Sequence, residues 1–305
     1  MESIFEGATS HWVRYSHYQL KKADNGNLYV TPAPYGKPEI YDAMKDSKQM
    51  VLDALNVGMR CMNREPEEEI QQAVMNFTAH YGLLGLMPAL PTTPSFMDYE
   101  AVYLPKNHFI KEESMKAEEY LSLFFPFGTL ETSKKGVASG WTVRTNTSAI
   151  ALNLTFADTP AAMSMSFQRG YAERYDWIVR QFKDWAFTLS GAFLYYEDYD
   201  KISESTRDLY RRGVATYGGN LPAYHIALLD SPTIVWDFHS LLLNIQMIFS
   251  FMLTDKEHPI RLCKNCTRAF IASRPAAAFC SPQCKNRYNV RKSRAKGREN
   301  NQEEF

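Results

Sequence analysis

Four cysteines near the end of the chain have the spacing of a metal site. They are Cys263, Cys266, Cys280 and Cys284, in the order Cys-x2-Cys-x13-Cys-x3-Cys. Two thiolates so close in sequence can hold one ion from a tight turn, and zinc favours a tetrahedral cage of sulfur ligands. Because four cysteines close the coordination sphere, the pattern predicts one structural Zn²⁺ rather than a catalytic one. The fifth cysteine, Cys61, is expected to be a buried, inert thiol.

The residues around the two cysteine pairs predict the shape of this site. Segments 269–272 and 276–279 have the right length for a small hairpin, joined through the Ser-Arg-Pro between them. Ser281 then supplies a helix cap and Pro282 a first-turn proline, which places Cys284 in the first turn of a helix. A knuckle, a hairpin and a helix that donates the last ligand make a treble-clef type of zinc finger.

Four unrelated thiols and a redox disulfide are the alternatives to a metal. In an intracellular protein, four cysteines within 22 residues indicate a metal rather than disulfides. The opening residues 1–7 lack the basic flank and apolar run of a secretory signal. The longest apolar stretch, Leu241 to Leu253, is too short to span a bilayer. We therefore expect a cytoplasmic protein that has no membrane partner.

A strongly basic segment surrounds and follows the cysteines. The formal net charge is zero, but residues 261–298 contain eleven Lys and Arg and no Asp or Glu, so the remainder is acidic. A helix from Pro282 to about Lys296 would place arginines on one stripe, with lysines beside it. The candidate nucleic-acid contacts are Lys285, Arg287, Arg291, Lys292, Arg294, Lys296 and Arg298. Such charge suits phosphates, and Arg also reads guanine edges, so we expect DNA, in preference to RNA, as the partner.

Other functions stay open at this point. The basic run could be a solvated tail, and treble-clef fingers also bind proteins. An enzyme in the N-terminal part is the third possibility, although the chain has no phosphate loop, dinucleotide glycine motif, His-Glu-x-x-His site or Gly-x-Ser-x-Gly elbow. Asp237 and His239 lie two apart in a predicted helix and would face different ways. We therefore assign no catalytic residue.

The cysteine segment resembles a known family. Phe279-Cys-Ser-Pro-Gln-Cys-Lys-Asn-Arg-Tyr288, preceded by the segment 261–270, is similar to the CGNR-type zinc finger at the C-terminus of uncharacterised bacterial proteins described as transcriptional regulators. Lys285 stands where that family has Gly, and the first pair is separated by two residues rather than four. The resemblance covers about residues 259–296. It implies a regulator whose larger N-terminal domain senses a signal or forms a homodimer.

The elements that support this finger are predicted to be mainly helical. Apolar spacing indicates helices over 40–62, after Glu65 and over about 113–124. Pro66 stands in the first turn of the second helix, and Gly82 is its expected stop. The core face of that helix consists of Ile70, Val74, Phe77 and Tyr81.

Two longer apolar stripes predict core helices, one after Gly170 and one after Ser231. The first stripe consists of Tyr171, Tyr175, Ile178, Phe182, Trp185, Leu189, Phe193 and Tyr196. The second consists of Ile234, Phe238, Leu241, Leu242, Ile245, Ile248, Phe249 and Met252. Strands are expected at 28–32, 149–156 and 224–229, and the last two each precede a cap and a proline, which suggests an internal duplication.

These observations predict a mainly α, α+β fold in three parts. Residues 1–258 form a helical body with a few short strands, whose role the sequence does not reveal. Residues 259–298 form the finger and its basic helix, and 299–305 form a disordered tail. The boundary is placed near His258 and Pro259, because composition changes sharply there.

Overall fold

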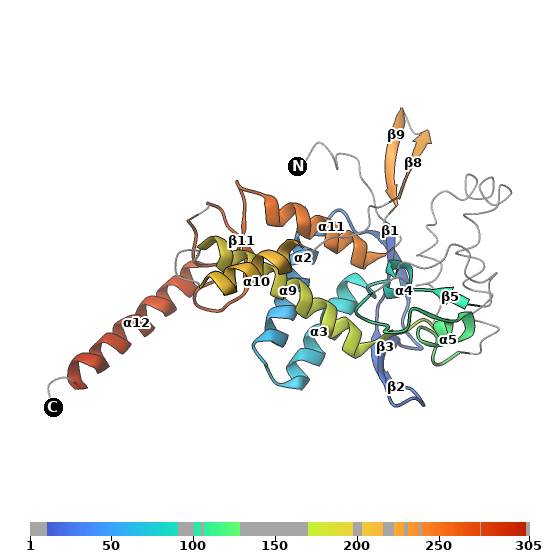
Figure 1. Cartoon of the computed structure of the whole chain (residues 1–305), viewed down its shortest axis with the longest axis horizontal. Helices are drawn as coiled ribbons and strands as arrows, with labels where there is room; N and C mark the ends of the chain where they lie inside the picture. The colour runs from blue at the N-terminus through green and yellow to red at the C-terminus, as the bar shows by residue number, and fades with distance from the viewer. Residues whose placement is uncertain are drawn as a thin grey trace. The chain divides into compact units, whose positions relative to one another are not determined.

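The protein combines long helices with several short sheets. The computed structural model in Figure 1 describes residues 11–90, 101–104, 107–128, 170–197, 203–215, 223–228, 231–237 and 240–302, apart from Pro275. The elements are β1 (His11–Tyr15), β2 (Tyr18–Lys22), β3 (Leu28–Pro32), β4 (Pro38–Asp42), α2 (Ser47–Met62), α3 (Glu67–Tyr81), α4 (Leu86–Ala89), β5 (Ala101–Tyr103), β6 (Ser114–Lys116), α5 (Ala117–Ser122), β7 (Glu173–Arg174), α9 (Tyr175–Glu197), α10 (Glu204–Ala215), β8 (Ala223–Leu228), β9 (Pro232–Asp237), α11 (Leu241–Thr254), β10 (Ile260–Leu262), β11 (Ala269–Ile271) and α12 (Pro282–Gln302). This composition confirms the α+β class.

The chain divides into two compact units. Unit 1 consists of residues 1–50, 66–181 and 219–248, and unit 2 of residues 51–65, 182–218 and 249–305. The cysteines therefore share unit 2 with most of α2 and α9 and with α10. The independent finger predicted after His258 and Pro259 stays a prediction. No helix in the described ranges is both long and apolar enough to cross a membrane.

The N-terminal strands of unit 1 pair over both short and long distances in sequence. β2 and β3 form an antiparallel hairpin, which confirms the strand predicted at 28–32, and β3 also pairs with β7. β1 pairs with β4, so that Val13 lies opposite Ile40. The helix predicted over 40–62 is therefore wrong in its first part and begins only at Ser47. Local spacing suited a helix, but the distant partner β1 makes this segment a strand.

The second predicted helix is confirmed as α3. It begins after Pro66, and its predicted core face is buried. Gly82 ends it with a φ of 91°, a left-handed backbone that glycine adopts without steric cost. A side chain at this position would also collide with the chain, because a Cβ would lie 2.5 Å from the carbonyl oxygen of Val13. Gly82 thus allows α3 to end directly against β1.

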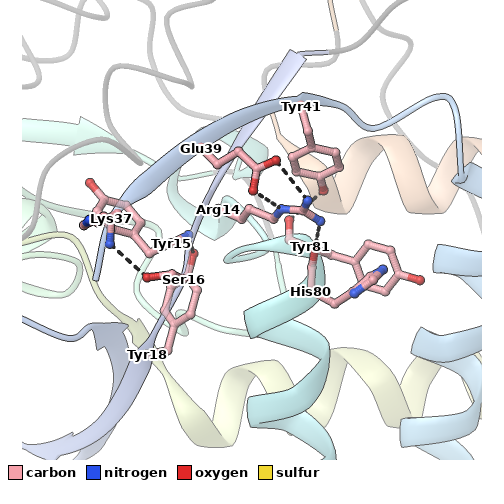
Figure 2. Close-up of polar contacts among 9 residues, drawn as sticks. All are labelled: Arg14, Tyr15, Ser16, Tyr18, Lys37, Glu39, Tyr41, His80 and Tyr81. Atoms are coloured by element: carbon pink, nitrogen blue, oxygen red, sulfur yellow. Dashed lines mark hydrogen bonds and ion pairs between the residues drawn. The ribbon is translucent and has the colours of Figure 1, made fainter. Parts of the chain in front are cut away.

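Arg14 joins three elements of unit 1, as Figure 2 shows. Its guanidinium donates to both carboxylate oxygens of Glu39, at 3.1 and 3.2 Å, and to the carbonyl of His80 at 2.7 Å. It also lies over the ring of Tyr41, whose hydroxyl donates to the carbonyl of Tyr81 at 2.7 Å. A cation at the last carbonyls of a helix is favourable. Arg14 therefore ties β1 and β4 to the end of α3.

Glu173 is a buried carboxylate that organises the loop between α3 and α4. It has no exposed surface, and it accepts hydrogen bonds from the backbone N–H groups of Leu84 (2.9 Å) and Leu86 (2.8 Å) and from the hydroxyl of Tyr171 (2.9 Å). Burial raises the pKa of Glu173, and these three donors oppose that rise. The carboxylate thus satisfies amide groups that no water reaches.

Replacement of Glu173 by Ala is expected to lower the free energy of unfolding by about 2–5 kcal/mol, because two buried N–H groups would lose their acceptor. Chemical denaturation with urea measures this change. The matched control is Glu112→Ala, which removes an exposed carboxylate of the same unit. The control should change the unfolding free energy by less than about 0.5 kcal/mol. An equal effect of both variants would contradict the supporting role of Glu173.

The helix predicted after Ser231 is wrong in its first half. β8 confirms the strand predicted at 224–229, but residues 232–237 form β9, antiparallel to β8. α11 begins only at Leu241. Its predicted apolar residues Leu241, Leu242, Ile245, Ile248, Phe249 and Met252 are all buried. The run 233–236 is β-branched or aromatic, a composition that favours a strand over a helix.

Two other predicted helices are found with different bounds, and one prediction is not covered. The helix expected over about 113–124 is the shorter α5, because β6 occupies 114–116. α9 is the helix expected after Gly170. Of its predicted stripe, the buried members are Tyr171, Tyr175, Ile178, Phe182, Trp185 and Leu189, of which Tyr171 precedes the helix. The strand predicted at 149–156, and with it the duplication, lies outside the described residues.

Candidate metal centre

A hairpin and a helix bring the four cysteines together. β10 and β11 are antiparallel, with Leu262 opposite Ala269, and Cys263 and Cys266 lie in the turn between them. Inside that turn the N–H of Thr267 donates to the carbonyl of Cys263 at 2.8 Å. A turn closed by such a bond directs both thiols to the same side.

The predicted hairpin is wrong, and a different hairpin takes its place, in which the segment expected as the first strand is the second. We expected 269–272 to pair with 276–279, whereas β11 pairs with β10. The described residues 276–279 form no strand, and the N–H of Lys264 donates to the carbonyl of Ala278 at 3.0 Å. The local pattern did not indicate β10, because a three-residue strand shows too little alternation to be recognised.

The second pair of cysteines is positioned by the start of α12. The hydroxyl of Ser281 accepts a hydrogen bond from the N–H of Cys284 at 3.2 Å, and Pro282 is the first helical residue. This confirms the predicted cap and places Cys284 in the first turn. The rings of Phe279 and Tyr288, with centroids 5.2 Å apart, pack the helix against the segment that precedes it.

The four sulfur atoms have the spacing of a single metal site. All four lie within 4.8 Å of one another. The sulfur of Cys280 is 3.7 Å from that of Cys266 and 3.6 Å from that of Cys284. A tetrahedral ion with metal–sulfur bonds near 2.3 Å requires sulfur–sulfur distances of about 3.8 Å. A disulfide would require about 2.05 Å. The cluster can therefore hold one metal ion, and Cys61, buried in α2, is not part of it.

Hydrogen bonds favour negative charge on two of the four sulfur atoms, those of Cys263 and Cys284. Burial raises the pKa of Cys263, but the backbone N–H groups of Cys280, Cys266 and Asn265 outweigh it and bring the pKa down to about 6. The side chains of Asn265 and Ser281 lower the pKa of Cys284. Burial and the neighbouring thiols raise the pKa of Cys280 to about 12. Burial also raises the pKa of Cys266. A bound cation would favour the thiolate form of all four side chains.

The helix α12 exposes almost all of its side chains. From Lys285 to Ala295 only Tyr288 is partly buried. The basic residues in this stretch are Lys285, Arg287, Arg291, Lys292 and Arg294. None of the five forms an ion pair or a side-chain hydrogen bond with the described part of the chain. Their positive charge is therefore available to another molecule.

The arginines and lysines of α12 lie on opposite faces. A helix turns by about 100° per residue, so that Arg287, Arg291 and Arg294 fall within about 60° of one another. Lys285 and Lys292 are about 140–160° away from Arg287 by the same count. The prediction that the lysines stand beside the arginine stripe is therefore wrong.

The end of α12 also differs from expectation. The helix continues to Gln302, so that the first four residues of the predicted tail, 299–302, are helical. Lys296 and Arg298 lie within the helix, but their side chains are outside the described ones. Like-charged residues four apart, such as Arg287 and Arg291, repel each other and did not favour so long a helix.

Two residues contact the cysteine turn, the turn between β10 and β11 that carries Cys263 and Cys266, or the strand that follows it. No sequence pattern predicts either contact. The side chain of Asn56 in α2 pairs with the backbone of Ala269, and Asn63 donates to the hydroxyl of Thr267 at 3.0 Å. Each pair is separated by more than 200 positions in the chain. No local pattern can reveal contacts over that distance.

Comparison with known proteins adds no family to this description. No protein-family model matches the chain, and no curated protein or solved structure is significantly similar to it. The resemblance of residues 259–296 to the CGNR-type finger stays a prediction from their sequence.

Proposed function

We propose that the protein binds duplex DNA through α12 and that one structural Zn²⁺, held by Cys263, Cys266, Cys280 and Cys284, anchors that helix. The observation that carries the proposal is that the four-cysteine cluster and an exposed basic helix lie in one segment of the chain. Four clustered cysteine sulfurs lie at the first turn of α12, and the next three turns expose basic residues that have no acidic partner among the described residues.

Zinc fits the donor set best. Soft thiolates in a tetrahedral arrangement select zinc or iron, and zinc with four cysteines is the usual structural combination. The cage leaves no open position for a water or a substrate, so the ion would stabilise the fold rather than perform a reaction. The backbone N–H groups around Cys263 are the kind of support that orients ligands in such sites.

Duplex DNA fits the exposed helix by charge and by size. A helix with its side chains is about 10–12 Å across, and the major groove is about 12 Å wide. The arginine face of α12 can meet phosphates or guanine edges, and no apolar stripe competes by packing α12 onto the protein. In this proposal the N-terminal part senses a signal or forms a homodimer, as the family resemblance implies for a transcriptional regulator.

The purified protein is expected to contain one zinc per chain, with Cys61 uninvolved, because the sulfur cage accommodates a single ion. Elemental analysis together with the protein concentration measures the ratio. A Cys61→Ala variant is the matched control and should retain its zinc. A Cys280→Ser, Cys284→Ser double variant that still held stoichiometric zinc would disprove the ligand assignment.

A direct binding experiment tests the DNA proposal. Zinc-loaded protein is titrated at low salt, by fluorescence anisotropy, with random duplex DNA, single-stranded DNA and RNA. We expect tightest binding to the duplex, and affinity that falls linearly in log–log form as salt increases. Binding to none of the three would exclude the proposal and favour a finger that recognises a protein.

A further inference from the structure

The cysteine turn is attached to α2 by side chains on one side of that helix. The amide of Asn56 accepts a hydrogen bond from the N–H of Ala269 at 2.8 Å and donates to the carbonyl of the same residue at 3.4 Å. Asn63, the first residue after α2, donates to the hydroxyl of Thr267 at 3.0 Å. Seven residues span about two helical turns, so the two asparagines face the same way.

Asn56 acts on the hairpin as a neighbouring strand would. Its amide binds both the N–H and the carbonyl of Ala269, the first residue of β11. Ala269 is buried, which limits the access of water to its backbone groups. A buried backbone group that loses its hydrogen bond is costly, and Asn56 therefore helps to hold the hairpin that carries Cys263 and Cys266.

Two residues at the contact made by Asn63 have an unusual backbone conformation, one next to Asn63 and one that is its partner. Arg64 has a φ of 55° and Thr267 a φ of 58°, and they are the two non-glycine residues with positive φ in the described ranges. A β-branched residue such as Thr rarely adopts this conformation, and it persists only where the surrounding structure enforces it. Thr267 directly follows the ligand Cys266 and receives the hydrogen bond from Asn63.

The left-handed conformation of Arg64 belongs to a defined helix ending. The N–H of Glu65 donates to the carbonyl of Arg60 at 3.2 Å, and the N–H of Arg64 donates to the carbonyl of Cys61 at 3.3 Å. These two bonds make a Schellman motif, in which glycine is the usual residue. An ion pair of 3.1 Å between Arg60 and Glu65 closes the same turn. The motif fixes the position of Asn63.

We propose that Asn56 and Asn63 are positioning residues of the metal centre, through which α2 controls the metal affinity of the cysteine turn. The inference rests on the proposed function, which takes the metal as zinc and α12 as the DNA-binding helix. By thermodynamic linkage, an α2 ending that favours zinc binding is itself stabilised by zinc to the same extent. A signal that displaced the end of α2 would therefore weaken zinc binding, and with it the anchor of the DNA-binding helix.

The test compares the full-length protein with an Asn56→Ala, Asn63→Ala double variant. Competition with a chromophoric chelator measures the zinc affinity, which is expected to be about tenfold weaker in the double variant for the loss of the two contacts. The matched control is Asn289→Ala, an exposed asparagine of α12 without a described contact, which should bind zinc as tightly as the wild type.

Hydrogen exchange supplies a readout that a merely structural role would not change. Removal of zinc from the wild type should speed exchange at residues 59–65, and this effect should be lost in the double variant, because the link between the two sites is gone. If the double variant does not fold, the single Asn63→Ala variant replaces it, since Asn63 is exposed. Its zinc affinity should fall about fivefold.

The outcomes separate the two proposals. A wild type that binds no zinc would refute the proposed function and this inference together. A wild type with one zinc, and variants that bind zinc equally tightly with unchanged exchange at 59–65, would leave the proposed function intact and overturn the control by α2.

Discussion

Replacement of Arg287, Arg291 and Arg294 together by Ala is expected to remove about three phosphate contacts. The DNA affinity should then depend less steeply on the salt concentration. On duplex DNA each contact contributes about −0.9 to the slope of log affinity against log salt, because it releases condensed counterions. Counted from a reference of about 1 M salt, the same slope predicts roughly three-thousandfold weaker binding at about 50 mM salt. Fluorescence anisotropy over a salt series measures both quantities, and the zinc content should not change.

Charge-matched double variants decide whether a face of α12 or only its charge binds DNA. Arg287→Ala, Arg291→Ala removes two charges from the arginine face, and Lys285→Ala, Lys292→Ala removes two from the opposite face. The first should lower the slope by about two contacts and the second by less than one. Equal effects would show that charge density alone is responsible and would contradict the arginine face as the docking surface.

Chelation of zinc is expected to unfold the cysteine segment while unit 1 stays folded. The described apolar residues that this segment buries are few, namely Ile260, Ala269 and Ala272 beside Cys263, so its apolar core cannot hold it together. Structural zinc sites supply about 10–16 kcal/mol in small finger peptides, and here that contribution would be lost. Circular dichroism should show a partial loss of helix, and hydrogen exchange should place it after His258.

The control for this experiment is reversal by added zinc. The wild type should recover its helical signal, whereas the Cys280→Ser, Cys284→Ser double variant should not. A loss of the helical signal of the whole chain on chelation would contradict the boundary near His258 and Pro259. It would show that the cysteine segment folds cooperatively with the helices of both units.

The fold could be predicted where one segment carries its own signal. α3 has a proline before it, acidic residues in its first turn, a periodic apolar face and a glycine after it, and all of these agree. The segments of β4 and β9 are predicted to be helical because their apolar spacing fits both the helix and the strand period over a few residues. Pairing with β1 and with β8 makes these two segments strands. Strand pairing is a tertiary property, so local spacing does not reveal it.

The metal centre shows the same division. Cysteine spacing predicts the four-sulfur cluster, because short pairs must converge from tight turns, and Ser281 with Pro282 predicts the helix start. The support that α2 gives through Asn56 and Asn63 was not predictable, since asparagine has no characteristic spacing and the partners are distant. The opposite placement of arginines and lysines, in contrast, follows from helical geometry alone.

Glu173 also has a consequence for synthesis on the ribosome. Leu84, whose amide needs this carboxylate, is translated 89 positions earlier. At elongation rates of about 5–20 residues per second, the nascent loop waits roughly 5–20 s for its acceptor. β3 waits even longer for its pairing with β7, since Val30 lies opposite Glu173. The earliest part of unit 1 therefore leaves the ribosomal tunnel before its core can form. That core is completed only when the middle of the chain has emerged.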